Sequence, residues 1–385
     1  MTNLKNYLEA KVNSRGNKNL NYLSSFFSET ELAILSNKTI SIVGTNGKSS
    51  TANNIAMLLK GLDKSYIAFT SPHLFDYKER MTAHKDLNFN EYIQYLENFE
   101  LKNNINLGYF ESTFLIAAKA FLHNDMDYFI CEAGIGGKYD TTSVIQSKTV
   151  VLTSIGLDHT DILGNKITDI LNQKINVSDN IETLFVSVLN KELIEIIKSQ
   201  YTNYSQSIYL SEYLISKNIL FSNLIFKELN YYLSLMVVDS LLQDIKYADL
   251  TNIKIQEAKG RFEIVNDSPI KIIDGAHNYE GVEILLRNYE NKYGHLNTDL
   301  FVGFKKGKDI NNIFNLIIGK TNYNLHLIED DTFFDQEITK EIGYLLDKHG
   351  KNYKISSLEQ FNRNKNPSIL LGSLYLIGEY KKRNI

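Results

Sequence analysis

The chain has 385 residues, and at ~150 residues per domain this length predicts two or three domains. Its composition, 43% hydrophobic and 22% charged, is that of an average globular protein and excludes wholesale disorder and collagen-like repeats. With 41 basic and 45 acidic residues the net charge is -4, so the chain has no global field for a polyanion, and we exclude nucleic acid as a main partner.

Three features of the sequence lead us to expect a cytoplasmic protein. No apolar run approaches the ~20 residues that would cross a bilayer, so we expect no membrane span. The first residues, MTNLKNYLEAKV, carry charges every few positions and lack the apolar core of a secretory signal. A single cysteine, Cys131, cannot form an internal disulfide, which is typical of a reducing compartment.

The first half of the chain alternates apolar β-rich runs with helical spacing. The predicted strands are Thr39–Val43, Tyr66–Phe69, Tyr128–Cys131, Val150–Ser154 and Leu184–Val188. The predicted helices are Thr51–Leu62, Asn90–Leu101, Ser112–His123, Lys191–Ser199 and Lys227–Leu242. This order predicts an α/β fold: a P-loop-type domain whose mostly parallel sheet is flanked by helices.

A polar stretch without an amphipathic stripe, Lys246–Lys259, separates this series from a second one. The second series has strands at Lys271–Ile273, Leu300–Phe304, Leu325–Ile328 and Ile369–Leu371, with helices after Asn278 and Asp309, near Gln336–Lys348 and at Ser373–Lys382. We therefore expect a larger domain at residues 1–252 and a smaller Rossmann-like α/β domain at residues 253–385.

A glycine-rich turn follows the first predicted strand. The sequence TISIVGTNGKSST places Gly44, Thr45, Asn46 and Gly47 before Lys48 and the start of a helix. Such a turn directs backbone N–H groups toward phosphate oxygens. Lys48 adds a charge for the β and γ phosphates, and the hydroxyl of Ser49 or Ser50 can hold the accompanying Mg²⁺. Ile42 stands where the usual P-loop has its first glycine, so this turn is a shorter variant.

Two further strand ends carry metal-ligand types. Glu132 ends an apolar strand, where an unpaired charge is costly, and the next strand leads into Asp158, His159 and Asp161. Ligands bind beyond the carboxyl ends of parallel strands, so these residues predict a divalent metal site. A salt bridge at Glu132 and a structural role for His159 are the alternatives. We reject Cys131 as a nucleophile with His159 as its base, because burial beside Glu132 raises its pKa.

Taken together, these motifs resemble the folylpolyglutamate synthase/dihydrofolate synthase family, a branch of the Mur-type ATP-dependent amide ligases. The resemblance covers most of the chain. It rests on GTNGKSS at Gly44, TSPHL at Thr70 with Glu79-Arg80, YFE at Tyr109, EAGIGGKYDTT at Glu132, TSIGLDHTDILG at Thr153, GRF at Gly260, DGAHN at Asp274, GKD at Gly307 and GSLY at Gly372. Ser49 departs from the glycine that is usual in the family.

The resemblance implies an ATP-dependent ligase of folate biosynthesis and one-carbon metabolism. Such an enzyme joins L-glutamate to dihydropteroate, or to the γ-carboxylate of folates, through an acyl phosphate. It requires ATP and Mg²⁺, with Mn²⁺ as a substitute, and we expect a cytoplasmic monomer with no nucleic-acid or membrane partner.

The resemblance also assigns residues. The implied catalytic residues are Lys48, Glu132, His159 and Lys174, the last of which the family carbamylates; a solvated helix lysine is the alternative. Implied ATP contacts are Gly44, Thr45, Asn46, Gly47, Lys48, Ser49, Ser50, Asn230, Arg261, Asp274 and His277. Implied metal ligands are Ser50, Ser71, Glu132 and His159. The substrate would contact Tyr109, Phe110, Glu111, Tyr139, Asp140 and Thr141. Another Mur-type amide ligase and a catalytically silent ATP-binding module are the alternative functions.

Overall fold

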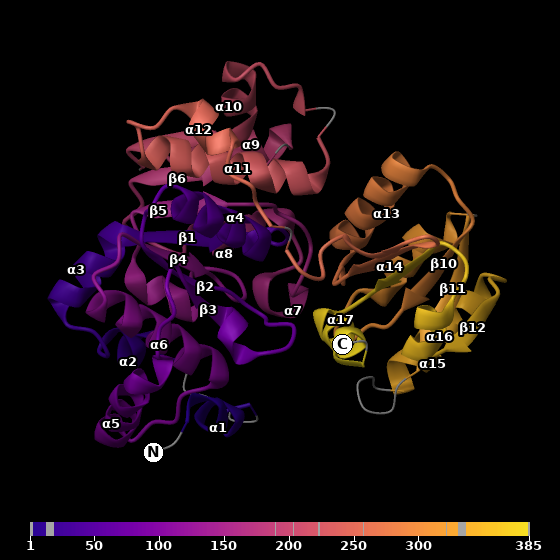
Figure 1. The fold of residues 1–385 in the computed structure, drawn as a ribbon, viewed down its shortest axis with the longest axis horizontal. Helices are drawn as coiled ribbons and strands as arrows, with labels where there is room; N and C mark the ends of the chain where they lie inside the picture. The colour runs from indigo at the N-terminus through magenta and orange to yellow at the C-terminus, as the bar shows by residue number, and fades with distance from the viewer. Residues whose placement is uncertain are drawn as a thin grey trace. The chain divides into compact units, whose positions relative to one another are not determined.

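A computed structural model describes residues 3–12, 19–188, 190–202, 204–221, 224–256, 258–320, 322–329 and 336–383. Contacts between Cα atoms divide the chain into two compact units (Figure 1). The first comprises Met1–Gly156 and Leu163–Gln256, and the second comprises Leu157–Ile162 and Glu257–Ile385. The short segment Leu157–Ile162 therefore groups with the second unit although both of its neighbours belong to the first. The domain limits at 252 and 253 stay a prediction.

The first unit contains a seven-stranded sheet of order β3-β2-β4-β1-β5-β6-β7. Its strands are β1 (Thr39–Val43), β2 (Tyr66–Phe69), β3 (Met81–Ala83), β4 (Tyr128–Glu132), β5 (Thr149–Leu152), β6 (Thr183–Val186) and β7 (Gln206–Tyr209). All neighbouring strands pair in parallel except β3, which runs antiparallel to β2. The predicted mostly parallel sheet is confirmed.

Helices cover both faces of this sheet, because successive side chains of each strand point to opposite faces. One face carries α4 (Lys48–Gly61), α10 (Leu210–Ser216), α11 (Phe226–Leu241) and α12 (Tyr247–Thr251), packed on residues such as Ile42 and Ile130. The other face carries α1 (Leu4–Glu9), α2 (Leu20–Ser24), α3 (Glu29–Lys38), α5 (Ile93–Asn103), α6 (Tyr109–His123), α8 (Ile167–Ile175) and α9 (Lys191–Gln200). The short α7 (Thr160–Leu163) follows β5.

The second unit contains a six-stranded sheet of order β12-β11-β10-β13-β9-β8. Its strands are β8 (Glu263–Asp267), β9 (Ile270–Asp274), β10 (Thr298–Val302), β11 (Tyr323–Ile328), β12 (Tyr353–Ser356) and β13 (Ser368–Leu371). Its helices are α13 (Tyr279–Tyr293), α14 (Ile310–Ile318), α15 (Gln336–Lys348), α16 (Leu358–Arg363) and α17 (Leu374–Arg383). Only β8 pairs antiparallel, so the smaller Rossmann-like unit is also confirmed.

The elements differ from the prediction mainly at their ends. Helix α4 begins at Lys48, three residues before the predicted start, because Gly47 adopts a left-handed conformation that ends the turn. Helix α6 begins at Tyr109 rather than Ser112, so the YFE motif forms its first turn. The polar stretch Lys246–Lys259 contains the short helix α12. Among the described residues, no helix is long and apolar enough to cross a bilayer.

Candidate functional site

The phosphate loop runs from Gly44 to Gly47 between β1 and α4, and both glycines are required by their surroundings. Gly44 has φ +151°, and a Cβ atom there would lie 1.9 Å from the Thr153 Oγ1. Gly47 has φ +90°, and its Cβ would lie 2.5 Å from the Asn230 Oδ1 of α11. Only glycine avoids both the strain and the overlap. The structure thus brings Asn230, a predicted ATP contact far along the chain, against this loop.

The end of β5 supports the loop from the side. The backbone N–H groups of Thr45 and Asn46 donate to the carbonyl and the hydroxyl of Ser154 over 2.8 and 2.9 Å. The hydroxyl of Thr153 donates to the carbonyl of Asn46 over 2.7 Å. Sequence reasoning missed Thr153 and Ser154; the signal was a pair of hydroxyls at the carboxyl end of a strand next to β1.

Two lysines converge on the same carbonyl of the loop. The Lys48 Nζ lies 2.9 Å from the carbonyl oxygen of Gly44 and 3.2 Å from that of Thr45. The Lys174 Nζ reaches the Gly44 oxygen over 2.8 Å from α8, and Lys174 is only 4% exposed. Because both are predicted catalytic residues 126 positions apart in sequence, their meeting is a strong sign of function. Two amines beside the N-terminus of α4 form a site suited to a polyanion.

A buried carboxylate lies close to the start of α4. Glu132, at the end of β4, is 1% exposed, and its Oε1 accepts a hydrogen bond from the Ser49 hydroxyl over 2.9 Å. Its Oε2 accepts from the backbone N–H of Ser71 over 3.0 Å. The structure therefore places Ser49, rather than the predicted metal ligand Ser50, on the carboxylate. The metal role of Ser50 stays a prediction.

The donors around Glu132 fit a hard divalent cation. Among the residues that the structure describes, no group of three or more His, Cys, Asp or Glu could hold a metal by itself. One carboxylate with serine oxygens is nevertheless the kind of set that Mg²⁺ uses when phosphates and water complete its shell. His159, the other predicted ligand, lies in the segment that groups with the second unit.

The predicted substrate residues come together from two segments. Phe110, in the first turn of α6, packs edge-on against Phe69 with ring centroids 5.3 Å apart. Glu111 is 3% exposed, and its Oε1 lies 3.4 Å from the Thr141 hydroxyl. Tyr139 is 69% exposed. A buried acid beside aromatic rings can recognise a flat heterocycle that carries N–H donors.

Asp140 shapes this region from within. Its Oδ2 accepts from the N–H groups of Gly134 and Ile135, both over 3.0 Å. Its Oδ1 accepts from the N–H and the hydroxyl of Thr142 over 3.0 and 2.8 Å. Burial raises the pKa of Asp140 above its usual range, although these hydrogen bonds oppose that shift. The carboxylate of Asp140 accepts four hydrogen bonds from the residues on either side of it, so its role here is to order the loop between β4 and Thr142.

Sequence reasoning did not assign a role to Arg80 and His73. Arg80 is 7% exposed, and its Nε donates to the His73 Nδ1 over 2.8 Å. Its Cζ lies 4.9 Å from the ring centroid of Tyr109. A guanidinium next to a predicted substrate residue can bind a carboxylate in a bidentate manner. Both residues stand in the TSPHL and Glu79-Arg80 motifs, which was the available signal.

The second unit brings three predicted ATP contacts together at the end of β9. The Asp274 carboxylate accepts from the N–H groups of Phe262 and Ala276, each over 2.7 Å. Burial raises the pKa of Asp274, and the charge of Arg261 opposes the shift. His277 lies two residues beyond Gly275, whose carbonyl oxygen its Nδ1 approaches within 2.8 Å. Their contribution to ATP binding stays a prediction.

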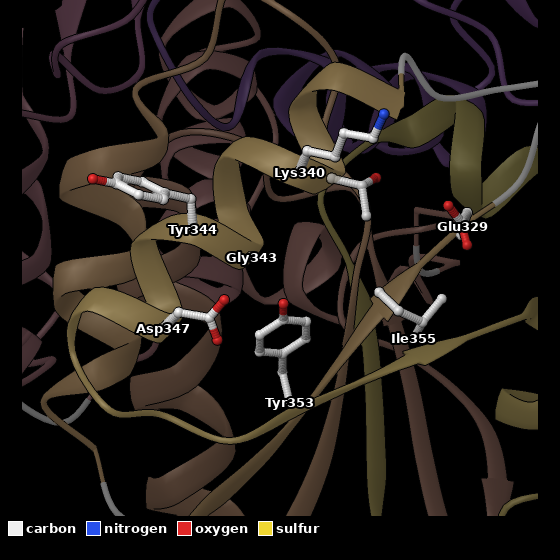
Figure 2. A pocket seen from close by; sticks show the side chains of 8 residues that line it. Glu329, Lys340, Gly343, Tyr344, Asp347, Tyr353 and Ile355 are labelled. Carbon is white, nitrogen blue, oxygen red and sulfur yellow. The ribbon is translucent and has the colours of Figure 1, made fainter.

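A separate pocket of about 310 Å³ lies at the edge of the second sheet (Figure 2). It is lined by Glu329, Thr339, Lys340, Gly343, Tyr344, Asp347, Tyr353 and Ile355. Gly343 makes room for Tyr353, because a Cβ atom at Gly343 would lie 2.8 Å from the phenol oxygen. This lining contains none of the residues that the sequence assigned, so the pocket is not the predicted site.

Comparisons with known proteins show which family the chain is similar to. Residues 42–235 match the model of the Mur ligase middle domain. The chain is 30% identical over 345 residues to the dihydrofolate synthase/folylpolyglutamate synthase of Buchnera aphidicola subsp. Schizaphis graminum. The matched region covers 82% of this chain and 80% of that protein.

Two solved structures are similar over nearly the whole chain. The folylpolyglutamate synthase of Mycobacterium tuberculosis, complexed with ADP, has a TM-score of 0.80 at 17% identity over 98% of this chain and 96% of that one. The bifunctional enzyme of Yersinia pestis, complexed with AMPPNP and Mn ion, has a TM-score of 0.77 at 21% identity over the same shares. At these identities the likeness shows the fold.

Proposed function

Because the chain belongs to the dihydrofolate synthase/folylpolyglutamate synthase family of Mur ligases, we propose that it is an ATP-dependent ligase forming amides of L-glutamate. The acceptors are dihydropteroate and the γ-carboxylate of folates. The products are the glutamylated acceptor, ADP and phosphate. ATP and a divalent cation are required.

One observation carries this proposal: the phosphate loop, two lysines and a buried carboxylate occupy one edge of one sheet. Lys48 and Lys174 both reach the Gly44 carbonyl, and Glu132 accepts from Ser49 at the start of α4. A nucleotide triphosphate supplies anionic oxygens that replace the carbonyl as the partner of the Lys48 ammonium. Phosphoryl transfer is catalysed mainly by positioning the phosphates and neutralising their charge, and these residues can do both.

In the first step, an oxygen of the acceptor carboxylate attacks the γ-phosphorus of ATP, the bond to the β-phosphate oxygen breaks, and ADP leaves. The N-terminus of α4 and the Lys48 ammonium stabilise the charge on the phosphate oxygens. Glu132, Ser49 and Ser71 would hold Mg²⁺, which when bound neutralises charge shared between the β and γ phosphates.

In the second step, the neutral amine of glutamate attacks the acyl carbon, and the resulting tetrahedral intermediate expels phosphate. The amine loses a proton, and an amide remains. Tyr109, Phe110 and Glu111 are proposed to hold the acceptor ring, while Asp140 orders the loop of Tyr139 and Thr141. Arg80 adds a cation for the acceptor's carboxylate.

Lys174 is proposed to carry a carbamate. A neutral lysine adds CO2 at its Nζ with loss of a proton, and the product is an anion that can lie near a metal, where an ammonium would be repelled. Its 4% exposure removes the alternative of a solvated helix lysine. Replacement by alanine should abolish turnover, and short carboxylic acids should restore part of it. Full activity without added acid would rule out the carbamate.

The test of the function measures phosphate release that depends on both glutamate and acceptor, with dihydropteroate and tetrahydrofolate in turn. Lys48→Ala and Glu132→Ala should abolish turnover without loss of secondary structure, whereas Lys198→Ala, at an exposed ion pair with Glu212, should behave as the wild type. Near-normal turnover in either site variant would refute the assignment.

The same assay separates the alternative functions. Turnover with muramyl acceptors alone would identify another Mur-type ligase, and ATP binding without turnover on any acceptor would identify a silent module. A cytoplasmic monomer is our further expectation, and gel filtration with light scattering tests the oligomeric state.

A further inference from the structure

The loop that follows β4 lies against the helix that carries Lys174, and both belong to the first unit. The backbone N–H of Lys138 donates to the carbonyl oxygen of Gln173 over 2.7 Å. Gln173 lies in the last turn of α8, where carbonyl groups need partners from outside the helix. The loop therefore caps α8 one residue before Lys174.

This close approach requires a glycine in the loop. Gly137 is buried, and a Cβ atom there would lie 2.6 Å from the carbonyl oxygen of Gln173. The same Cβ would lie 2.5 Å from the carbonyl oxygen of Lys174 and 2.9 Å from its Cα. All three are backbone atoms, so no side-chain rotation makes room. A methyl group at this position must displace the last turn of α8.

A displacement of that turn acts directly on the amine of Lys174. The Lys174 Nζ already lies 2.8 Å from the Gly44 carbonyl oxygen, and the residue is 4% exposed. Its neighbours Ile170, Leu171 and Ile175 are fully buried, so α8 is packed and has little freedom to compensate. The side chain is thus fixed at one end by the loop and at the other by the phosphate loop.

The other end of the same loop contacts a predicted acceptor residue instead. A Cβ atom at Gly134 would lie 2.9 Å from the Cζ of Phe110, at the tip of the ring. A ring tip can tilt, so a methyl group here moves Phe110 rather than the backbone of α8. Two glycines three positions apart therefore serve different neighbours, and substitutions at them have separable effects.

We propose that Gly137 is the positioning residue of Lys174: it lets the backbone of the loop rest on the last turn of α8 and so fixes the Nζ at the phosphate loop. This inference rests on the proposed function, because it takes Lys174 as a catalytic residue. Gly137 has no side chain to offer a substrate, so its effect is exerted through Lys174.

The first test measures how well the Lys174 amine is protected, without any substrate. The full chain is acetylated with sulfo-N-hydroxysuccinimide acetate in CO2-free buffer, so that no carbamate masks the amine, and each lysine peptide is quantified by mass spectrometry. Gly137→Ala should raise the rate at Lys174 roughly 10-fold or more, because overpacking promotes local opening. Lys119, which is 8% exposed in the same unit, should keep its wild-type rate.

Two control variants accompany Gly137→Ala. Gly319→Ala adds the same methyl group at the right-handed C-cap of α14, where the nearest atoms are 3.6 Å away. Lys138→Ala removes an exposed side chain of the loop and keeps the N–H that Gln173 accepts. Both should leave the acetylation of Lys174 unchanged.

A second variant covers the case in which Gly137→Ala does not fold. Lys138→Pro removes the N–H donated to Gln173 and adds no atom at Gly137, which as a glycine tolerates a following proline. It should raise the acetylation of Lys174 in the same way. An unchanged rate at Lys174, or an equal rise at Lys119, overturns the inference.

The second test separates the two glycines by kinetics of glutamate-dependent phosphate release. Gly137→Ala should lower kcat about 10- to 100-fold and leave the KM for the acceptor unchanged, as expected when a catalytic group is displaced. Gly134→Ala should raise the KM for the acceptor through Phe110. A wild-type kcat in Gly137→Ala overturns the inference. If Lys174→Ala is itself fully active, the proposed role of Lys174 fails, whatever the acetylation shows about its position.

Discussion

Replacing Ser49 by alanine removes a hydrogen bond that fixes the buried carboxylate of Glu132. Ser49 donates to the Glu132 Oε1 over 2.9 Å, and the N–H of Ser71 remains as the donor to Oε2. A hydrogen bond to a charged group contributes about 1.5–3 kcal/mol. Since 1.4 kcal/mol corresponds to a factor of ten, the apparent affinity for Mg²⁺ should fall roughly 10- to 100-fold.

The assay is glutamate-dependent phosphate release titrated with Mg²⁺ at saturating ATP and acceptor. For Ser49→Ala, the half-saturating Mg²⁺ concentration should rise, and excess Mg²⁺ should recover most of the rate. Ser50→Ala should shift the titration less, and Ser199→Ala, on the exposed helix α9, should not shift it. A larger shift for Ser50→Ala than for Ser49→Ala would refute the reasoning from the Glu132 contact.

Three other changes have distinct expected results. Gly44→Ala places a methyl group 1.9 Å from the Thr153 Oγ1, so ATP affinity by calorimetry should fall more than about tenfold; unchanged affinity would contradict the rigid loop. Asp140→Ala leaves the buried N–H group of Thr142 without this acceptor, at a cost of about 1–3 kcal/mol, and should raise the KM for the acceptor substrate while the KM for ATP stays constant. Burial lowers the pKa of His326, so the unfolded chain binds a proton at this residue at a higher pH than the folded chain does. The free energy of unfolding should therefore fall as the pH drops below about 6.5, by at most about 1.4 kcal/mol per pH unit. His326→Gln should flatten this dependence in urea titrations, and an equal slope in both proteins would contradict it.

Much of the fold was predictable because apolar runs of the right length mark buried parallel strands. All five residues of β1 are buried, as its apolar sequence predicts. The glycine-rich turn and Lys48 that follow it indicate the start of a helix. The edge strands β3, β7, β8 and β12 were not predicted. They are three to five residues long and partly exposed, so their sequence lacks the apolar signal.

The residues of the candidate site were predictable as types, but their contacts were not. Consecutive helix residues point about 100° apart, so the pattern Lys-Ser-Ser cannot tell which hydroxyl faces Glu132; the register of α4 against β4 decides it in favour of Ser49. Likewise, nothing local at Lys174 indicates that α8 aims it at the Gly44 carbonyl. The contact of Arg80 with His73 and Tyr109 depends on a loop and a helix that meet only in the folded chain.

The most direct measurement follows the oxygen atoms of the acceptor. Dihydropteroate whose carboxylate is labelled with oxygen-18 is converted with ATP and L-glutamate, and the released phosphate is analysed by mass spectrometry. If the carboxylate attacks the γ-phosphorus, each phosphate carries one labelled oxygen and the amide keeps the other. Phosphate without label alongside glutamylated product would show that no acyl phosphate forms, and it would contradict the account.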